Sequence, residues 1–231
     1  MRKWITFIYV LFAVSLQATE SASLQKSQNY WENYYSAKEG VAYPTDFSQA
    51  CLQYIPKDST LIELGCGNGR DAFFFGKHGI QVVAYDLSNN VIEKLHRQNP
   101  YPHVSFKEGD FTSLDSQLQH APIGAIYSRF TMHSIPAEAA SRVYRWAFDQ
   151  LAKGGYFFVE VRSIHDPLYG VGEKVARDAY FSDHYRRFIR IDELVKELQE
   201  IGFKVENAAE SKGFARFKDQ DPPVIRIIAK K

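Results

Sequence analysis

Residues 61–70 read LIELGCGNGR, and this stretch decides the fold. Its apolar beginning predicts a buried strand that contains Leu61, Ile62 and Leu64. Glycine then recurs at every second position, at Gly65, Gly67 and Gly69, before a helix-compatible segment at residues 71–77. A loop without side chains lets a ligand approach the backbone closely. In an open α/β sheet, the crevice at such a strand's carboxyl end is where ligands bind. The alternative is a purely structural turn.

A second predicted strand, residues 81–85 (QVVAY), ends at Asp86. The interval from Glu63 to Asp86 fits one helix plus one strand, as in a β-α-β unit. A carboxylate at the end of the second strand can accept both hydroxyls of a ribose. We therefore predict that Asp86 binds a ribose. The alternative is that Asp86 caps a helix over residues 89–98, a role for which Ser88 competes.

The glycine spacing separates two families. The dinucleotide fingerprint is G-x-G-x-x-G, whereas this loop is G-x-G-x-G preceded by Glu63. It resembles motif I of the class I S-adenosylmethionine-dependent methyltransferases. Further family motifs follow in order: Asp110 after a third strand, a fourth strand at residues 124–127, and a Lys-Gly-Gly turn at residues 153–155 before a fifth strand. The likeness covers roughly residues 28 to 231.

This resemblance implies the fold and the cofactor. The expected fold is Rossmann-like α/β, with a seven-stranded, mainly parallel sheet in the order 3-2-1-4-5-7-6. The last strand runs antiparallel, and helices cover both faces. The expected cofactor is S-adenosyl-L-methionine. Its predicted binding residues are Glu63, Gly65, Cys66, Gly67, Asn68, Gly69, Arg70, Asp86, Leu87, Asp110, Phe111, Ser128 and Trp31.

Several of these roles carry an alternative. By the resemblance, Leu87 flanks the adenine, Asp110 binds its exocyclic amine, and Phe111 contacts the ring; Gly-Asp is also common turn chemistry. Arg70 follows the loop and is placed to reach the cofactor carboxylate. In small-molecule members of the family, a segment like YWENYY at residues 30–35 covers the cofactor. An aromatic helix face packed on the core is the competing account of that segment.

Methyl transfer is an in-line displacement, so holding the nucleophile and the methyl group in line supplies most of the rate. A base helps when the acceptor is a hydroxyl or a protonated amine. His133, just past the fourth strand, is the predicted base, and a capping or partly buried histidine is the alternative. Arg129 is predicted to clamp an anionic group of the acceptor. Pairing of Arg129 with a structural carboxylate is equally open.

The long stretch from residue 165 to 187 is predicted to follow the fifth strand as a lid or substrate element. Its predicted substrate-binding residues are His165, His184, Tyr185 and Arg186. They favour a polar or anionic small-molecule acceptor, and a solvated basic loop is the alternative. The spacing of His165, Asp166 and His184 fits no standard metal site, so we expect no metal.

The place after the fourth strand lacks the [DN]-P-P-[YFW] motif of many amino-methylating enzymes and holds YSRF at residues 127–130. The chain is therefore similar to the small-molecule branch, such as thiopurine and tellurite methyltransferases or enzymes that methylate polysaccharide precursors. Two other functions stay open. One is a non-catalytic metabolite-binding protein on the same fold. The other is an NAD(P)-dependent oxidoreductase, which the glycine spacing disfavours.

Composition agrees with one globular domain. The chain has 231 residues, of which 45% are hydrophobic, enough for a full α/β core. The formal net charge of +1 gives no reason to expect a nucleic-acid partner. The two cysteines, Cys51 and Cys66, are expected to be free thiols.

The amino-terminal segment differs from the rest. Arg2 and Lys3 precede an uncharged apolar run at residues 4–16 (WITFIYVLFAVSL). A basic start with a short apolar core is typical of a secretory signal peptide, and the run is too short for an ordinary membrane span. Residues 17–23 match a cleavage site poorly, so an uncleaved hydrophobic anchor stays open. We expect residues 1–23 to be one or the other and residues 24–231 to be a single methyltransferase domain. The protein would be exported (periplasmic or secreted) or, as the alternative, membrane-anchored and facing the cytoplasm. Any membrane contact would come through this segment.

Overall fold

The computed structural model describes residues 22, 24–27, 29–34, 43–113, 122–217 and 219–231. The predicted signal peptide or anchor at residues 1–23 lies outside these ranges, apart from residue 22. Within the described ranges, every helix is too short or too polar to span a bilayer.

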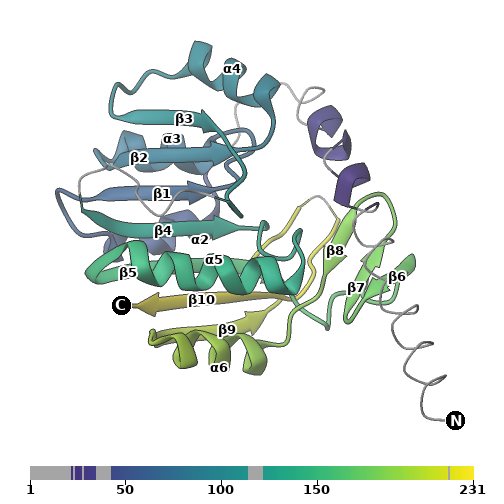
Figure 1. Cartoon of the computed structure of the whole chain (residues 1–231). Coiled ribbons are helices and arrows are strands. Elements are labelled where there is room, and N and C mark those ends of the chain that lie inside the picture. Colours follow the sequence, from purple (N-terminus) through teal and green to yellow (C-terminus); the bar gives the residue numbers. More distant parts are fainter. Residues whose placement is uncertain (1–21, 23, 28, 35–42, 114–121, 218) are drawn as a thin grey trace, which may run out of the picture.

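Seven strands form the main sheet (Figure 1). They are β1 (Thr60–Leu64), β2 (Gln81–Asp86), β3 (Val104–Glu108), β4 (Ile123–Arg129), β5 (Leu151–Arg162), β9 (Lys204–Ser211) and β10 (Val224–Lys230). Their spatial order is β3-β2-β1-β4-β5-β10-β9, and β10 runs antiparallel to both of its neighbours. Because β10 is the seventh of these strands along the chain, the predicted order and the antiparallel last strand are confirmed.

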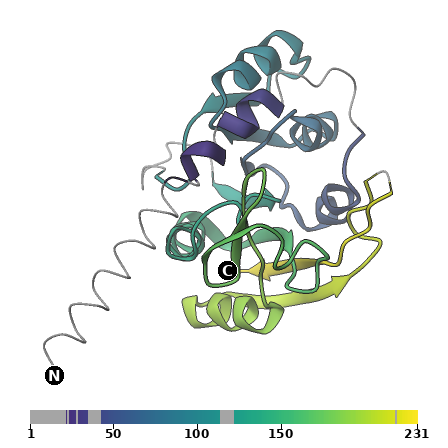
Figure 2. The same ribbon diagram turned by 90° about the vertical axis from the view of Figure 1, so that its right-hand side faces the viewer.

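Helices cover both faces of the sheet (Figures 1 and 2). They are α2 (Asp46–Cys51) with the 3-10 turn η1 (Leu52–Tyr54), α3 (Arg70–Lys77), α4 (Asn89–Gln98), α5 (Ala137–Gln150) and α6 (Ile191–Ile201). One core contains Phe47 of α2, Phe75 of α3 and Leu95 of α4, and the opposite core contains Val143 of α5 and Leu198 of α6. In the central strands alternate residues enter opposite cores, as in β2, where Val82 and Ala84 enter one core and Val83 and Tyr85 the other.

Local chemistry sets the ends of three helices, and the Ser88 cap was among the alternatives that the sequence offered. The Thr45 hydroxyl accepts a hydrogen bond from the Ser48 N–H and caps α2, and the Ser88 hydroxyl accepts one from the Val91 N–H and caps α4. Gly202 ends α6 with a φ of 122°, a conformation that few residues other than glycine adopt.

The central strands end together. In the parallel ladder, Leu64 of β1 lies beside Tyr85 of β2 on one side and Ser128 of β4 on the other. The loops that follow these three strands therefore share one edge of the sheet.

Two local features differ from the sequence prediction. The stretch at residues 165–187 contains a separate antiparallel sheet of β6 (Glu173–Ala176), β7 (Ala179–Phe181) and β8 (Tyr185–Arg187), beside the carboxyl edge of the main sheet (Figure 1). The predicted Lys-Gly-Gly turn is part of β5, which begins directly after α5. Its register with β4 jumps between Ile123–Leu151 and Ala125–Tyr156. Gly154, with a φ of 83°, permits this bulge.

Candidate active site

Hydrogen bonds hold the glycine loop against the end of β2. The N–H groups of Gly65 and Cys66 both donate to the carbonyl oxygen of Tyr85, at 2.8 and 2.9 Å. The Gly67 N–H donates to Oδ2 of Asp86 at 2.8 Å. These bonds place the loop and the predicted ribose carboxylate side by side at the carboxyl edge of the sheet, as the sequence predicted.

Glycine is required in this loop by conformation and by space. Gly65, Gly67 and Gly69 have φ values of 75°, 51° and 72°. A Cβ atom at Gly65 would lie 2.3 Å from Cγ2 of Thr131, a residue that the sequence analysis did not single out. Asn68 is exposed at the tip, Arg70 is half-buried at the start of α3, and the thiol of Cys66 is buried. Cys51 is likewise a buried free thiol.

Asp86 does not cap α4, because Ser88 does. Its Oδ1 accepts the Ser88 N–H at 3.1 Å, and each carboxylate oxygen can accept more than one hydrogen bond. Burial raises the pKa of Asp86, against the lowering effect of the Ser88 and Gly67 N–H groups. Leu87 beside it is 47% exposed, an apolar surface next to the crevice.

Glu63 is buried within β1, and its Oε2 atom has no hydrogen-bond partner among the described residues. Burial raises the pKa of Glu63 well above its ordinary value, and the charges of Asp71 and Asp86 raise it further. An unsatisfied buried carboxylate is costly in a folded protein. Its position under the glycine loop indicates a site for a cationic or hydrogen-bond-donating ligand.

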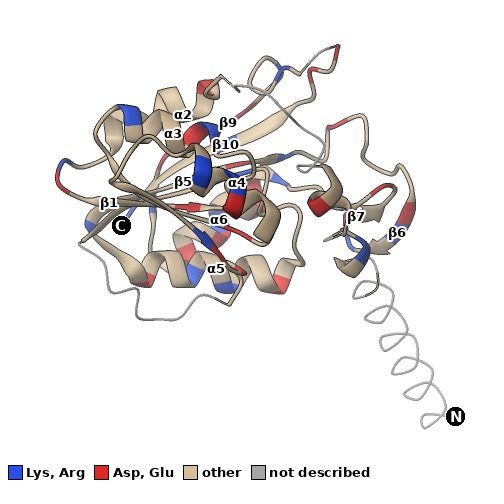
Figure 3. Cartoon of the chain, turned by 90° about the horizontal axis from the view of Figure 1, so that it is seen from above, with Lys and Arg blue, Asp and Glu red and all other residues tan. Residues whose placement is uncertain are grey.

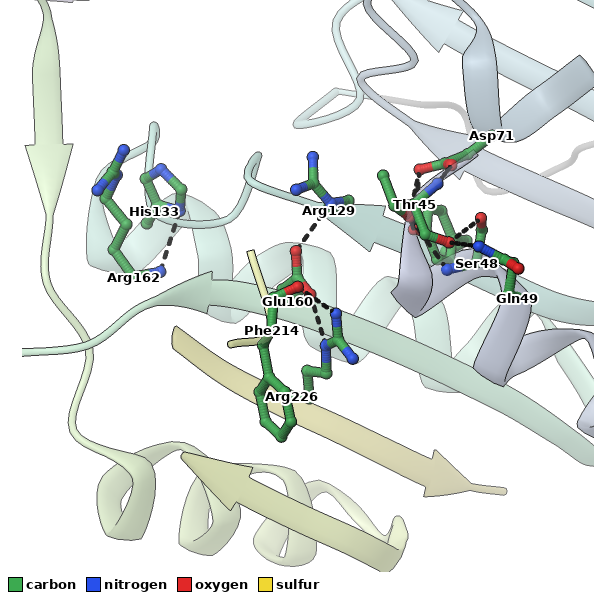
Figure 4. A network of polar contacts seen from close by, with 11 residues as sticks. Thr45, Ser48, Gln49, Asp71, Arg129, His133, Glu160, Arg162, Phe214 and Arg226 are labelled. Atoms are coloured by element: carbon green, nitrogen blue, oxygen red, sulfur yellow. Dashed lines mark hydrogen bonds and ion pairs between the residues drawn. The ribbon is translucent and has the colours of Figure 1, made fainter. Parts of the chain in front are cut away.

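Asp71 is a supporting residue that the sequence analysis missed (Figure 4). Its carboxylate accepts hydrogen bonds from the Thr45 N–H at 2.8 Å, the Thr45 hydroxyl at 3.0 Å and the Tyr127 hydroxyl at 3.0 Å. It therefore ties the segment before α2 and strand β4 to the first turn of α3. An acidic residue in the first turn after the loop was the available signal.

The remaining predicted cofactor residues lie around the same crevice. Oδ1 of Asp110 accepts hydrogen bonds from the N–H and hydroxyl of Thr112, the turn geometry that stood as its alternative. Phe111 is buried in the core and lies near Gly65. The hydroxyl groups of Ser128 and Thr131 are 2.6 Å apart at the end of β4.

The amino-terminal helical segment at residues 29–34 lies between α4 and the small sheet (Figure 2). Glu32 accepts a hydrogen bond from Asn90 of α4, and its charge helps to raise the pKa of Asp86. On the other side, the rings of Tyr30 and Trp31 lie 4.4 and 4.6 Å from the ring of His184. The segment thus contacts α4 on one side and His184 on the other, and its role as a cover over the cofactor stays a prediction.

A buried ion network spans three strands (Figure 4). Glu160 of β5 is completely buried between Arg129 of β4 and Arg226 of β10, its register partners on the neighbouring strands. Arg226 Nε donates to Oε2 at 2.6 Å. Arg129 Nε lies 2.7 Å from Oε1, an ion pair without hydrogen-bond alignment. The structure therefore shows Arg129 in the alternative predicted for it, paired with a structural carboxylate.

His133 is also buried. Its Nδ1 accepts the Arg162 N–H at 3.4 Å, and its carbonyl oxygen accepts the Arg187 N–H at 2.7 Å. Burial lowers its pKa well below the ordinary value, and the charge of Arg162 adds to the effect. Because Nδ1 of His133 already accepts the Arg162 N–H, the geometry favours the structural alternative over the base.

The four predicted substrate-binding residues lie in different surroundings. Tyr185 is completely buried in the small cluster with Val175 and Ala179, so its side chain is a packing residue and substrate binding by it is not supported. The side chain of His165 is 67% exposed and its Nδ1 lies 2.6 Å from Glu210.

Arg186 and His184 share a carboxylate. Arg186 lies 2.6 Å from Asp183, which also lies 3.4 Å from Nδ1 of His184. Burial, with a contribution from Arg186, lowers the pKa of His184 to about 3. Among the described residues, no group of three or more His, Cys, Asp or Glu side chains is placed to hold a metal ion.

Comparison with known proteins gives the family. A parallel sheet whose first two strands present a glycine loop and a carboxylate to one crevice defines a nucleoside-binding α/β protein. The profile of the methyltransferase domain family matches residues 30–208, and the chain belongs to this family. The prediction of the class I methyltransferase superfamily is thereby confirmed.

Individual relatives agree with this placement. An S-adenosyl-L-methionine-dependent Diels-Alderase of Talaromyces variabilis is 29% identical over 141 residues, covering 55% of this chain and 47% of its own. The N-demethylindolmycin N-methyltransferase of Streptomyces griseus is 27% identical over 118 residues, covering 49% of each chain. The matches thus span about half the length of these relatives. The crystal structure of a SAM-dependent methyltransferase from Methanosarcina mazei superposes with a TM-score of 0.67 at 18% identity, covering 78% of this chain and 95% of that one, which supports the fold.

Proposed function

We propose that the protein is an S-adenosylmethionine-dependent methyltransferase that acts on a small-molecule acceptor. The observation that carries the proposal is the bond from the Gly67 N–H to Asp86 beside the unpartnered buried carboxylate of Glu63. Family membership supports the reaction class.

The charge of the crevice supports this cofactor over a dinucleotide. Glu63 lies in the strand that leads into the glycine loop, and its pKa is raised by burial and then by the negative charges of Asp71 and Asp86. Such a negative field suits a ligand that carries a sulfonium and an ammonium group and opposes a pyrophosphate. An NAD(P)-dependent oxidoreductase is the weaker alternative for this reason as well as for its glycine spacing.

The residues present fit the cofactor. Asp86 would hold the ribose hydroxyls, Leu87 would flank the adenine, and Glu63 would hold the ammonium group of the amino-acid moiety. When bound, the cofactor supplies an activated methyl group. The chain positions the reactants. Strands β1 and β4 lie side by side, so the loops that follow them would fix where an acceptor can approach the methyl group.

The acceptor is polar or anionic in this proposal. Three guanidinium groups, those of Arg129, Arg162 and Arg226, gather near Glu160 and Asp166 at this end of the sheet, and such groups suit a polar or anionic acceptor. Elsewhere basic and acidic residues are interspersed along the described chain (Figure 3).

The proposal is tested by calorimetry with S-adenosylmethionine, S-adenosylhomocysteine and NAD. We expect the first two to bind and NAD not to bind; binding of NAD alone would overturn the proposal. A panel of small acceptors, read by release of S-adenosylhomocysteine, then separates an enzyme from a non-catalytic metabolite-binding protein. In the same assay His133→Ala tests the base: loss of turnover with cofactor affinity kept would support it.

We further propose that residues 1–23 are a secretory signal peptide and that the protein is exported. The basic residues at positions 2 and 3 and the apolar run at residues 4–16 support this. Sequencing of the amino terminus of the protein from its native host is the test. A mature chain that begins near residue 24 would support export, and an intact start in the membrane fraction would indicate an anchor instead.

A further inference from the structure

Arg187, the last residue of β8, joins the small sheet to the loop after β4. This loop covers residues 130–136, between the end of β4 and the start of α5. The Arg187 N–H donates to the carbonyl oxygen of His133 at 2.7 Å. Its guanidinium group donates from Nη2 to the carbonyl oxygen of Met132 at 3.0 Å, and from Nε to that of Ile135 at 3.3 Å. One residue of the small sheet therefore holds three carbonyl groups of the loop.

The charge of Arg187 is not matched by a carboxylate. Two other arginines of the same region form ion pairs, Arg186 with Asp183 at 2.6 Å and Arg190 with Asp178 at 3.2 Å. Arg187 is half-buried, and among the described residues its guanidinium group forms no ion pair. A partly buried charge without a counter-charge costs stability. What Arg187 contributes is therefore its planar fork, which can serve two carbonyl oxygens at a fixed separation.

The loop that Arg187 holds packs against the glycine loop. Cγ2 of Thr131 lies 2.3 Å from the position that a Cβ atom at Gly65 would take, so this methyl group rests directly on the backbone of Gly65. The hydroxyl groups of Thr131 and Ser128 are 2.6 Å apart, which holds Thr131 near the end of β4. The carbonyl group of Met132, bound by Arg187, belongs to the next residue along the chain. A shift of this carbonyl group would therefore move the methyl group on Gly65.

We propose that Arg187 is a positioning residue that sets the affinity for the cofactor by holding Thr131 against Gly65. This inference rests on the proposed methyltransferase function. Arg187 acts through the loop: it fixes the carbonyl group of Met132, and the Thr131 methyl group then supports the glycine loop from below. The small sheet and the cofactor loop are thereby coupled. Because such coupling is reciprocal, cofactor binding should in turn stabilise β8.

The chain offers a matched control in Arg190, three residues after Arg187. Its Nε atom donates to Oδ2 of Asp178 at 3.2 Å, in the turn between β6 and β7. The carbonyl oxygen of Asp178 accepts the Phe188 N–H at 2.8 Å, so this turn is tied to the end of β8. Both arginines thus anchor the small sheet, but the hydrogen bonds of the Arg190 side chain go to Asp178 and not to the loop after β4.

The test is calorimetry of the full chain with S-adenosylhomocysteine. Arg187→Met should weaken binding about tenfold, whereas Arg190→Met should leave the affinity unchanged. Arg187→Lys keeps the charge and the aliphatic stem, so it serves if the methionine variant does not fold. Its ammonium group cannot serve two carbonyl oxygens as the planar fork does, and we expect a loss of about threefold. Melting temperatures are recorded alongside, and both methionine variants should melt below the unmodified protein.

Two further measurements separate positioning from a general loss of structure. Thr131→Ser removes the Cγ2 methyl group that rests on Gly65. If Arg187 acts through this methyl group, Arg187→Met in the Thr131→Ser background should weaken binding by no more than about twofold further. In amide hydrogen exchange, S-adenosylhomocysteine should slow the exchange of β8 in the unmodified protein and not in Arg187→Met.

The outcomes that contradict the inference are distinct. Equal losses of affinity in Arg187→Met and Arg190→Met would show that any damage to the small sheet has this effect, and would overturn it. Unchanged affinity in the Arg187 variants, or additive losses in the double variant with Thr131→Ser, would overturn it as well. Failure of S-adenosylhomocysteine to bind the unmodified protein would instead defeat the methyltransferase proposal.

Discussion

The two ends of the carboxyl edge of the sheet are built differently. At the end of β1 and β2, the N–H groups of the glycine loop donate to Tyr85 and Asp86, and the Oε2 atom of Glu63 has no hydrogen-bond partner in the described part of the chain. At the end of β4 and β5, the charged groups are already matched, Arg129 with Glu160 and Arg162 with Asp166. The first region leaves a buried carboxylate oxygen for a ligand to satisfy, whereas the polar groups of the second region are largely satisfied by one another.

The largest effect is expected from a substitution that disrupts the Arg129–Glu160–Arg226 ion network of the second region. Glu160→Gln leaves the buried guanidinium groups of Arg129 and Arg226 without their carboxylate. We expect the free energy of unfolding to fall by about 3–5 kcal/mol, measured by urea denaturation. Glu210→Gln, at a partly exposed carboxylate on β9, is the control and should cost less than about 1 kcal/mol. Similar losses in both variants would contradict a special role for Glu160.

A smaller effect is expected in the first region. Asp86→Ala should weaken S-adenosylmethionine binding by about 1–3 kcal/mol, because it strands the Gly67 N–H and removes the ribose acceptor. Calorimetry is the measurement. Asp110→Ala is the comparison, and we expect a lesser loss because Asp110 already serves Thr112. An unchanged affinity in Asp86→Ala would remove the ribose assignment.

Binding of the cofactor should be coupled to the release of a proton from Glu63. Its raised pKa means that the free folded protein holds a proton that the unfolded chain releases, so stability falls as pH rises above the ordinary glutamate pKa of 4.5. A bound cation favours the ionised form, so binding should release a proton. Calorimetry in buffers of different ionisation enthalpy measures this release. Glu63→Gln should abolish it, and release that persists in this variant would assign the proton elsewhere.

The smallest expected effect is on the pH dependence of stability and comes from His184, which contacts the amino-terminal helical segment. Burial lowers the pKa of His184 in the folded protein to about 3, whereas the pKa of a histidine in the unfolded chain is 6.5. Between these two pH values the unfolded chain binds a proton that the folded chain does not. Stability should therefore fall as pH drops below about 6.5. His184→Asn should show a shallower fall between about pH 6.5 and 4.5, where Asp183 stays ionised, because its pKa is lowered. Melting temperatures across this range provide the test, and parallel curves would contradict it.

The sequence predicted the first region better than the second for a physical reason. Glycine spacing, strand hydrophobicity and the Ser88 cap are local patterns, and they located β1, the loop, β2 and α4. The pairing of Arg129 with Glu160 joins residues on different strands, and no local pattern distinguishes it from an acceptor clamp. The strands of the small sheet are three or four residues long, shorter than the window in which alternation can be recognised. For Tyr185, polarity suggested a ligand contact, but tertiary packing buried the ring.

Strand β10 lies between β5 and β9, although it is the last strand along the chain. The hydrogen-bonding edge of β5 therefore stays open until residues 224–230 have been synthesised, and β9 has no partner in the main sheet before then. Such long-range closure makes folding slow and leaves intermediates with unpaired strands. Truncation within residues 224–230 should therefore leave both edges unpaired and produce insoluble material.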